Sequence, residues 1–130
     1  NQLVSNVKFV GLVNESQKKF LFEKTDLMIM PTLDESKNKS IEGFGISYLE
    51  AAFFGIPSIA SSVGGAPEVV INQSTGIIID NIDELYDTTK KLLIDNLNLK
   101  LLGENAKKRS MNDFNWEKVI NDYCSIFFKQ

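Results

Sequence analysis

The 130-residue sequence contains no histidine, a single cysteine (Cys124) and a single arginine (Arg109). The absence of histidine excludes Ser-His-Asp and Cys-His catalytic sites and histidine-ligated zinc centres from this chain. One cysteine cannot form an internal disulfide bond, which fits a reducing cytoplasm, and Cys124 is best interpreted as a packing residue on a helix. Because there is only one arginine, any phosphate-binding cations in this sequence must be mostly lysines.

Long apolar runs and an excess of positive charge are also missing. No apolar run approaches the roughly 20 residues that a membrane-spanning helix needs. The formal net charge is −3, which argues against a general binder of nucleic acids or other polyanions. Hydrophobic residues make up 43% of the chain and charged residues 24%, proportions that are typical of a globular domain with a core of its own.

Apolar runs alternate with helical patterns along the sequence, which predicts βα units and a parallel sheet. The expected strands cover residues 7–12, 27–30, 58–61 and 76–80, with 27–30 buried on both faces. The expected helices cover residues 15–24, 45–54, a short turn starting near Pro67, about 83–93 with Asp83 as its cap, about 99–109, and a last helix from near Asn115. The predicted fold class is α/β, a Rossmann-like doubly wound parallel sheet with helices on both faces.

Several of these helices carry sequence signals at their ends. Asn14 followed by Gln17 predicts a capping box for helix 15–24, which is expected to bury Phe20 and Leu21. Gly55 and Pro57 predict the end of helix 45–54. The last helix is strongly amphipathic, with apolar residues at i, i+3, i+4 and i+7 spacing: Trp116, Val119, Ile120, Tyr123, Ile126 and Phe127.

The stretch EGFGISYLE, residues 42–50, has a carboxylate at each end of a mostly apolar run. On a helical wheel that starts at Ile46, Glu50 falls at about 40°, inside the arc that contains Ile46 and Phe53. We therefore expect a buried carboxylate, which is costly unless hydrogen bonds satisfy it. Either backbone donors in the core satisfy Glu50, or a ligand offers hydroxyl groups to it.

Glycines in the same stretch point to an anion. Gly43 and Gly45 flank Phe44 and let the backbone approach a ligand closely. The N–H groups of Gly45, Ile46 and Ser47 would lie at a helix N-terminus that follows the carboxyl end of a strand, where open α/β sheets bind ligands and where anions are favoured. Anion-binding amides between two hydroxyl-accepting carboxylates match a diphosphate with a hydroxyl-rich ring on each side, as in a nucleotide sugar.

Glu42 and Glu50 enclose seven residues, and this spacing resembles the E-x7-E signature of retaining glycosyltransferases of the GT-B fold. Further blocks resemble, in the same order, the C-terminal domain of glycosyltransferase family 4 (glycosyl transferases group 1). The form EGFGISYLEA is especially similar to members that act on bacterial lipid or polysaccharide acceptors. The matching blocks are Val7–Gly11, Asp26–Pro31, Glu42–Ala52, Gly55–Ile59, Gly64-Gly65 with Glu68, Thr75-Gly76 and Phe114–Trp116.

The resemblance implies a donor site made of Glu42, Gly43, Phe44, Gly45, Ile46 and Glu50. Glu50 would accept hydrogen bonds from the ribose hydroxyls, and Glu42 would be the catalytic residue that contacts the transferred sugar. The amides around Phe44 would hold the distal phosphate and the sugar, and would stabilise charge on the departing diphosphate. No metal and no cofactor are expected.

The resemblance also implies that residues 1–130 are a C-terminal donor-binding domain without its first βαβα segment and without the N-terminal acceptor domain. Strands 7–12 and 27–30 would then be separated by two absent strands, which leaves open sheet edges. This chain alone would be inactive. The implied partners are a nucleotide-sugar donor and a glycan or lipid-linked acceptor, not nucleic acid, in the cytoplasm or at the inner face of the cell membrane as a peripheral protein.

Of three alternatives, only the first remains open at this point. A non-catalytic nucleotide-sugar-binding or interaction module would share the fold without the activity. A nicotinamide or flavin dinucleotide domain would need G-x-G-x-x-G, but Tyr48 occupies the place of the third glycine after Gly43 and Gly45. A receiver-like signalling domain would need an acidic cluster after its first strand, which the sequence lacks.

Overall fold

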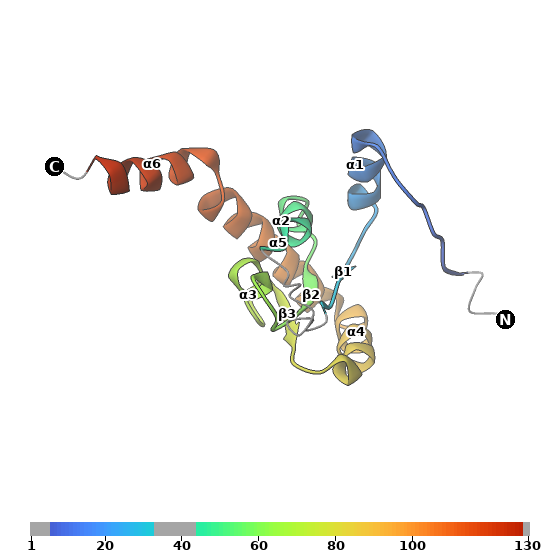
Figure 1. Cartoon of the computed structure of the whole chain (residues 1–130). Helices are drawn as coiled ribbons and strands as arrows, with labels where there is room; N and C mark the ends of the chain where they lie inside the picture. Colours follow the sequence, from blue (N-terminus) through green and yellow to red (C-terminus); the bar gives the residue numbers. More distant parts are fainter. Residues whose placement is uncertain (1–5, 33–43, 129–130) are drawn as a thin grey trace, which may run out of the picture.

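A computed structural model describes residues 6–32 and 44–128 of the protein (Figure 1). Its centre is a parallel sheet of strand order β1-β2-β3, formed by β1 (Met28–Ile29), β2 (Ser58–Ser61) and β3 (Gly76–Ile79). Met28 pairs with Ser58, and Ser58 pairs with Gly76 on its other side. Helices surround this sheet, so the predicted α/β fold with a parallel sheet is confirmed.

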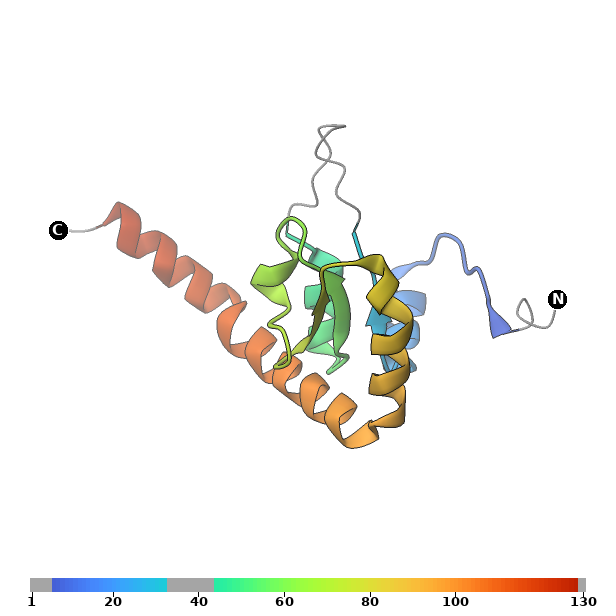
Figure 2. The same cartoon turned by 90° about the horizontal axis from the view of Figure 1, so that it is seen from below.

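Helices cover both faces of the sheet (Figure 2). The side chains of β2 alternate between the two hydrophobic cores that lie under these helices. Ala60 packs with Tyr48 and Val69, under α2 (Ile46–Phe53) and α3 (Ala66–Val69). Ile59 packs with Leu92 and Leu102, under α4 (Leu85–Ile94) and α5 (Asn96–Asp113). The central strand β2 is therefore buried on both sides, as a strand inside a parallel sheet requires.

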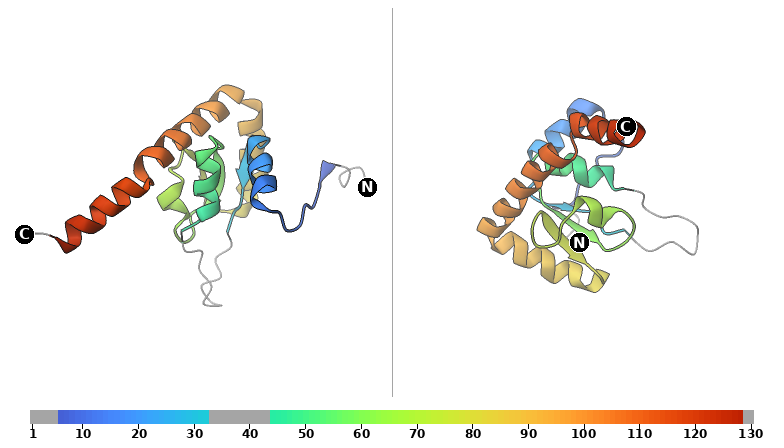
Figure 3. Two further views of the ribbon diagram at one scale, coloured as in Figure 1. Left: turned by 90° about the horizontal axis from the view of Figure 1, so that it is seen from above. Right: turned by 90° about the vertical axis from the view of Figure 1, so that its left-hand side faces the viewer.

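Residues 7–12 do not form the predicted strand. They run away from the sheet as an extended segment (Figure 3), with Phe9 95% exposed and Leu12 fully exposed. A strand exists only through pairing with a neighbour, and no strand in the described ranges lies beside this segment. The β-type sequence pattern is present here without a partner that would make it a strand.

A lack of neighbouring elements among the described residues also leaves side chains of α1 (Glu15–Glu23) and of β1 exposed. The capping box of Asn14 with Gln17 is confirmed. Phe20 is 59% exposed and Leu21 37% exposed, so the predicted burial of these two residues is wrong. β1 is shorter than residues 27–30 and exposes Ile29, because it pairs only with β2 in the described part of the chain. The prediction of a strand buried on both faces is therefore also wrong.

The C-terminal half follows its local signals with two corrections, of which one is that Cys124 is exposed and not the packing residue that was expected. Asn81, not Asp83, caps the helical segment that begins with the 3-10 turn η3 (Ile82–Glu84) and continues as α4, and its capping box is closed by Glu84. α5 is longer than predicted and begins after its cap Asp95. Asn115 caps α6 (Trp116–Phe127) as expected.

Two glycines let α2 and α5 approach each other closely. A Cβ added to Gly103 on α5 would lie 2.1 Å from the carbonyl oxygen of Gly55, the left-handed residue that ends the α2 segment. Because that neighbour is backbone, it cannot rotate away, and both helices would have to move apart. Gly103 thus fixes how closely α2 is held against the rest of the fold.

We predict that Gly103→Ala destabilises the chain by about 1–3 kcal/mol, the usual cost of overpacking a core. Helix propensity alone would change stability by about 1 kcal/mol in the opposite direction, so the sign of the change tests the contact. Urea denaturation measures the free energy of unfolding. Glu104→Ala, at the next and exposed position of α5, is the control and is expected to change stability little. A Gly103→Ala variant as stable as the parent would contradict the packing described here.

Candidate functional site

The start of α2 is held by a tyrosine that packs against a left-handed glycine. Gly45 has φ +76°, and its carbonyl accepts hydrogen bonds from the N–H groups of Tyr48 and Leu49. Tyr48 is 1% exposed, and its hydroxyl donates to the carbonyl of Met30, just beyond β1. This side chain therefore ties the first turn of α2 to the carboxyl end of the sheet.

A second contact fixes the chain at that same end. The Thr32 N–H donates to the Ser61 hydroxyl oxygen at 3.0 Å, and the Ser61 hydroxyl donates back to the Thr32 carbonyl at 2.8 Å. Ser61 ends β2, so Thr32 is held beside the carboxyl end of the central strand. The predicted site residues Glu42 and Gly43 lie outside the described residues, whereas Phe44, Gly45, Ile46 and Glu50 are described and lie together at the start of α2.

Glu50 is not the buried acid that the helical wheel predicts. Ile46 is 68% exposed and the Glu50 side chain 37% exposed, whereas Tyr48 and Ala51 face the core. The wheel fails because α2 buries the face that carries Tyr48, Ala51 and Ala52. The apolar arc that contains Ile46 and Phe53 is left more exposed. Glu50 consequently lies on the surface that faces α1.

The Glu50 carboxylate is paired with a lysine from α1. Lys18 Nζ donates to Glu50 Oε1 at 2.8 Å and also approaches Glu15 Oε2 at 3.3 Å. The hydrogen bond to Glu50, followed by that to Glu15, raises the pKa of Lys18 above its ordinary value of 10.5. Oε2 of Glu50 has no hydrogen-bond donor among residues 6–32 and 44–128, so one oxygen of this carboxylate remains open to a ligand.

The pair lies in a groove between α1 and α2. The groove has a volume of about 450 Å³ and both charged and aromatic walls. It is lined by Glu15, Ser16, Lys18, Lys19, Phe22, Glu50, Phe53 and Phe54. One wall is closed by the stacked rings of Phe22 and Phe54, whose centroids are 5.2 Å apart. A ring with hydroxyl groups would find apolar faces and a carboxylate acceptor here.

The other element of the site is the N-terminus of α2. The N–H groups of Ile46 and Ser47 precede the internal hydrogen-bond ladder of the helix, where amides favour anions. Glu50 follows Ile46 by four residues, so it lies on the same face about 6 Å further along the helix axis. Open amides and a carboxylate acceptor thus share the exposed face of α2.

Sequence reasoning missed Lys18, Tyr48, Thr32 and Ser61. Lys18 and Glu50 are 32 residues apart, and no spacing rule connects residues on different helices. Tyr48 had a local signal, because it stands three residues after Gly45 in the first turn of the predicted helix. Neither a metal-binding group of three or more His, Cys, Asp or Glu side chains nor a helix able to cross a membrane is found within the described ranges.

Comparison with known proteins identifies the family. The family model described as "Glycosyl transferases group 1" matches residues 2–109. This chain belongs to the glycosyl transferases group 1 family. Its Rossmann-like α/β arrangement is that of GT-B glycosyltransferases.

Curated relatives include enzymes that use different sugars. A GDP-mannose-dependent alpha-(1-6)-phosphatidylinositol monomannoside mannosyltransferase of Mycobacterium tuberculosis is 30% identical over 119 residues, covering 90% of this chain and 31% of that protein. An N-acetyl-alpha-D-glucosaminyl L-malate synthase of Bacillus anthracis is 30% identical over 133 aligned positions, covering 98% of this chain and 33% of that protein. The group 1 chain described here thus spans about a third of the length of these relatives.

Solved structures show the same fold. A sucrose-phosphate synthase from Thermosynechococcus elongatus superposes with a TM-score of 0.81 at 26% identity, over 97% of this chain and 30% of that one. Anabaena HepE, solved in complex with UDP-glucose, superposes with a TM-score of 0.79 at 21% identity, over 99% of this chain and 34% of that one. At that identity the HepE likeness supports the fold alone.

The contact between Gly45 and Tyr48 generates a prediction for Gly45→Ala. An alanine Cβ would lie 2.6 Å from Cδ2 of the buried Tyr48 ring, in a left-handed backbone conformation that already costs about 1–2 kcal/mol. We expect a total loss of stability of about 2–4 kcal/mol, measured by urea denaturation. Gly11→Ala is the matched control, because Gly11 has φ +63° but a Cβ there meets nothing within 4 Å. Equal losses for both variants would show that Tyr48 does not fix the turn.

The Lys18–Glu50 pair generates a pH prediction. Because the pKa of folded Lys18 is raised, the pair stabilises the fold below pH about 10 and loses this contribution as pH rises through the folded pKa. The stability difference between the parent and Lys18→Met should therefore be constant at neutral pH and shrink in strong alkali. Glu50→Gln should lower the Lys18 pKa, measured by NMR titration, more than the control Glu15→Gln does. A larger effect of Glu15→Gln would contradict the assignment of Glu50 as the main partner.

Proposed function

We propose that this chain is the C-terminal donor-binding domain of a retaining family 4 glycosyltransferase, and that it binds a nucleotide-diphosphate sugar at the start of α2. The observation that carries the proposal is that the first-turn amides and Glu50 lie on the same exposed face of α2, in a chain of the group 1 family. Amides of the first turn and the open oxygen of Glu50 lie one helical turn apart there. In a nucleotide the ribose and the diphosphate are neighbouring groups. The ribose hydroxyls need a hydrogen-bond acceptor, and the diphosphate oxygens need donors.

In this proposal Glu50 accepts hydrogen bonds from the ribose hydroxyls, in the groove between α1 and α2. The amides around Phe44, Gly45 and Ile46 hold the distal phosphate and the sugar. Glu42, the catalytic residue, contacts the transferred sugar, and Gly43 belongs to the same donor-binding set. Glu42 and Gly43 enter on sequence resemblance, because they lie outside the described residues.

The reaction breaks the bond between the anomeric carbon and the diphosphate oxygen, so negative charge grows on the departing diphosphate. Amides preorganised at a helix N-terminus stabilise that charge without rearrangement. The proposed acceptor is a glycan or lipid-linked molecule that binds a separate N-terminal domain. We also propose that the protein works in the cytoplasm or peripherally at the inner face of the cell membrane, without a metal ion or cofactor.

The Lys18–Glu50 salt bridge favours a second candidate, a non-catalytic module of the same fold. In that case Glu50 serves only to attach α1 to α2, and its half-exposed position needs no ligand. The two candidates differ in a measurable way. A structural Glu50 makes Glu50→Ala and Lys18→Met equivalent in every assay, whereas a ribose-binding Glu50 does not.

We predict that Glu50→Ala weakens the binding of the preferred nucleotide among UDP, GDP, UDP-glucose and GDP-mannose by about 1–3 kcal/mol, as for other lost hydrogen bonds to charged groups. Isothermal titration calorimetry measures the dissociation constants. Lys18→Met should lower stability but leave nucleotide binding within about threefold of the parent, because it removes a surface pair and no ribose acceptor.

Glu23→Ala is the matched control, because Glu23 lies on α1 outside the groove lining. Loss of binding in Glu50→Ala alone supports the ribose role. Unchanged affinity in Glu50→Ala would contradict that role, and a folded parent chain that binds none of the four nucleotides would support the module.

A further inference from the structure

Phe44, the residue before the left-handed Gly45, packs against the ring of Phe114, which follows the C-terminal end of α5. Its side chain packs against the core cluster that contains Tyr48 and Val69. On its other side, Phe114 approaches edge-on, with ring centroids 5.7 Å apart and an interplanar angle of 66°. This edge-to-face geometry is the favoured one for aromatic pairs. Phe44 is thus clamped between the core and Phe114.

Phe114 is itself fixed by the single arginine of the chain. The Arg109 guanidinium lies over the Phe114 ring, 4.8 Å from its centroid. The same guanidinium donates from Nη1 to the Val69 carbonyl at 2.7 Å and from Nη2 to the Glu68 carbonyl at 2.9 Å. Its Nε lies 3.4 Å from Asp113 Oδ2. The planar fork therefore connects the end of α3 to the end of α5 and covers Phe114 at the same time.

These contacts form a continuous chain from Arg109 through Phe114 and Phe44 to Gly45. Arg109 is held by two backbone carbonyls, so it does not serve as a free phosphate-binding cation in this structure. Phe114 is the C-cap residue that directly follows α5, before the turn into α6, and its N–H donates to the Ser110 carbonyl. Arg109, Phe114 and Phe44 each have a further anchor outside this chain of contacts, which suits a support for the left-handed turn at Gly45.

We propose that Phe114, held by Arg109, is a positioning residue for the nucleotide diphosphate, an inference that rests on the proposed function. By fixing the Phe44 ring, it fixes the direction in which the N–H groups of Gly45 and Ile46 point. Phe114 does not touch the ligand and acts only through Phe44. Removing the ring should leave the core intact, loosen the turn and weaken the grip on the diphosphate.

The test uses Phe114→Leu in the complete chain, with two readouts. The first is the backbone heteronuclear NOE of Gly45 and Ile46 without ligand, which reports motion on the picosecond to nanosecond scale. The second is the dissociation constant for UDP and GDP. We expect a lower heteronuclear NOE at both residues and binding roughly three- to tenfold weaker, the range that an aromatic pair commonly contributes.

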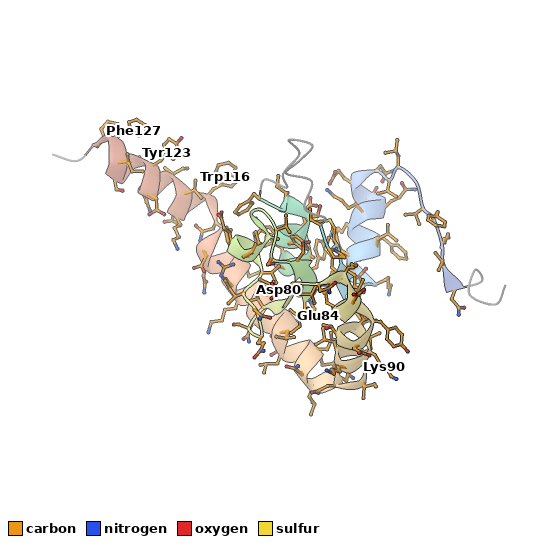
Figure 4. The ribbon with its side chains drawn as sticks, turned by 60° about the horizontal axis from the view of Figure 1, so that its bottom comes forward. Asp80, Glu84, Lys90, Trp116, Tyr123 and Phe127 are labelled. Carbon is orange, nitrogen blue, oxygen red and sulfur yellow. The ribbon has the colours of Figure 1, made fainter. Side chains whose placement is uncertain are left out.

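Three further variants separate positioning from general stability. Phe114→Tyr keeps the ring and should restore both readouts. Arg109→Lys keeps the charge but loses the planar fork, so it should change both readouts in the same direction as Phe114→Leu. Phe127→Leu is the matched control, because Phe127 lies on the part of α6 that projects from the body of the molecule (Figure 4), and it should change neither readout.

The inference is overturned if Phe114→Leu leaves the Gly45 NOE unchanged and binds the nucleotide within twofold of the parent. It is also overturned if Phe127→Leu weakens binding as much, because the effect would then be unspecific. A parent chain that binds neither UDP nor GDP overturns the proposed function and, with it, the nucleotide role of Phe114. The NOE values without ligand distinguish a failure of the proposed function from a failure of the positioning role. They report how Phe114 affects the mobility of Gly45 whether or not a nucleotide binds.

Discussion

The packing of Tyr48 against the left-handed Gly45 is the contact on which the site depends. Gly45 can turn the chain into α2 only because it lacks a Cβ, and the buried ring fills the space that a Cβ would need. The Tyr48 hydroxyl then joins the helix to the carbonyl of Met30 beyond β1. The Tyr48 side chain thus holds the turn at Gly45 in place, with the amides of the turn at the carboxyl end of the sheet.

The charged side chains near that turn are engaged in contacts within the protein. Lys18 forms a salt bridge with Glu50, so this partly exposed carboxylate has a cationic partner. Arg109 is engaged by carbonyls at the end of α3, so its guanidinium is not free to bind an anion near α2. A site built from amides and one carboxylate fits the proposed binding of a diphosphate leaving group.

Local features of the fold were predictable, whereas features that require a partner were not. Asn14, Gly55 and Asn115 end or begin helices through contacts within a few residues, and all three predictions are confirmed. Residues 7–12 have the composition of a strand but no neighbour to pair with. The helical wheel predicts Glu50 in the core because it considers only which positions are apolar. The actual packing buries Tyr48 and Ala51 and brings Gly103 against Gly55. The partner of Glu50 is 32 residues away and on another helix, where spacing carries no information.

The central claim is that the start of α2 and Glu50 hold one nucleotide between them. The most direct test is a crystal structure of the chain with whichever of UDP or GDP binds more tightly. Our account predicts diphosphate oxygens within hydrogen-bond distance of the Gly45 and Ile46 nitrogens, and a ribose hydroxyl on Glu50. A nucleotide bound elsewhere on the molecule, with Glu50 still held only by Lys18, would contradict it.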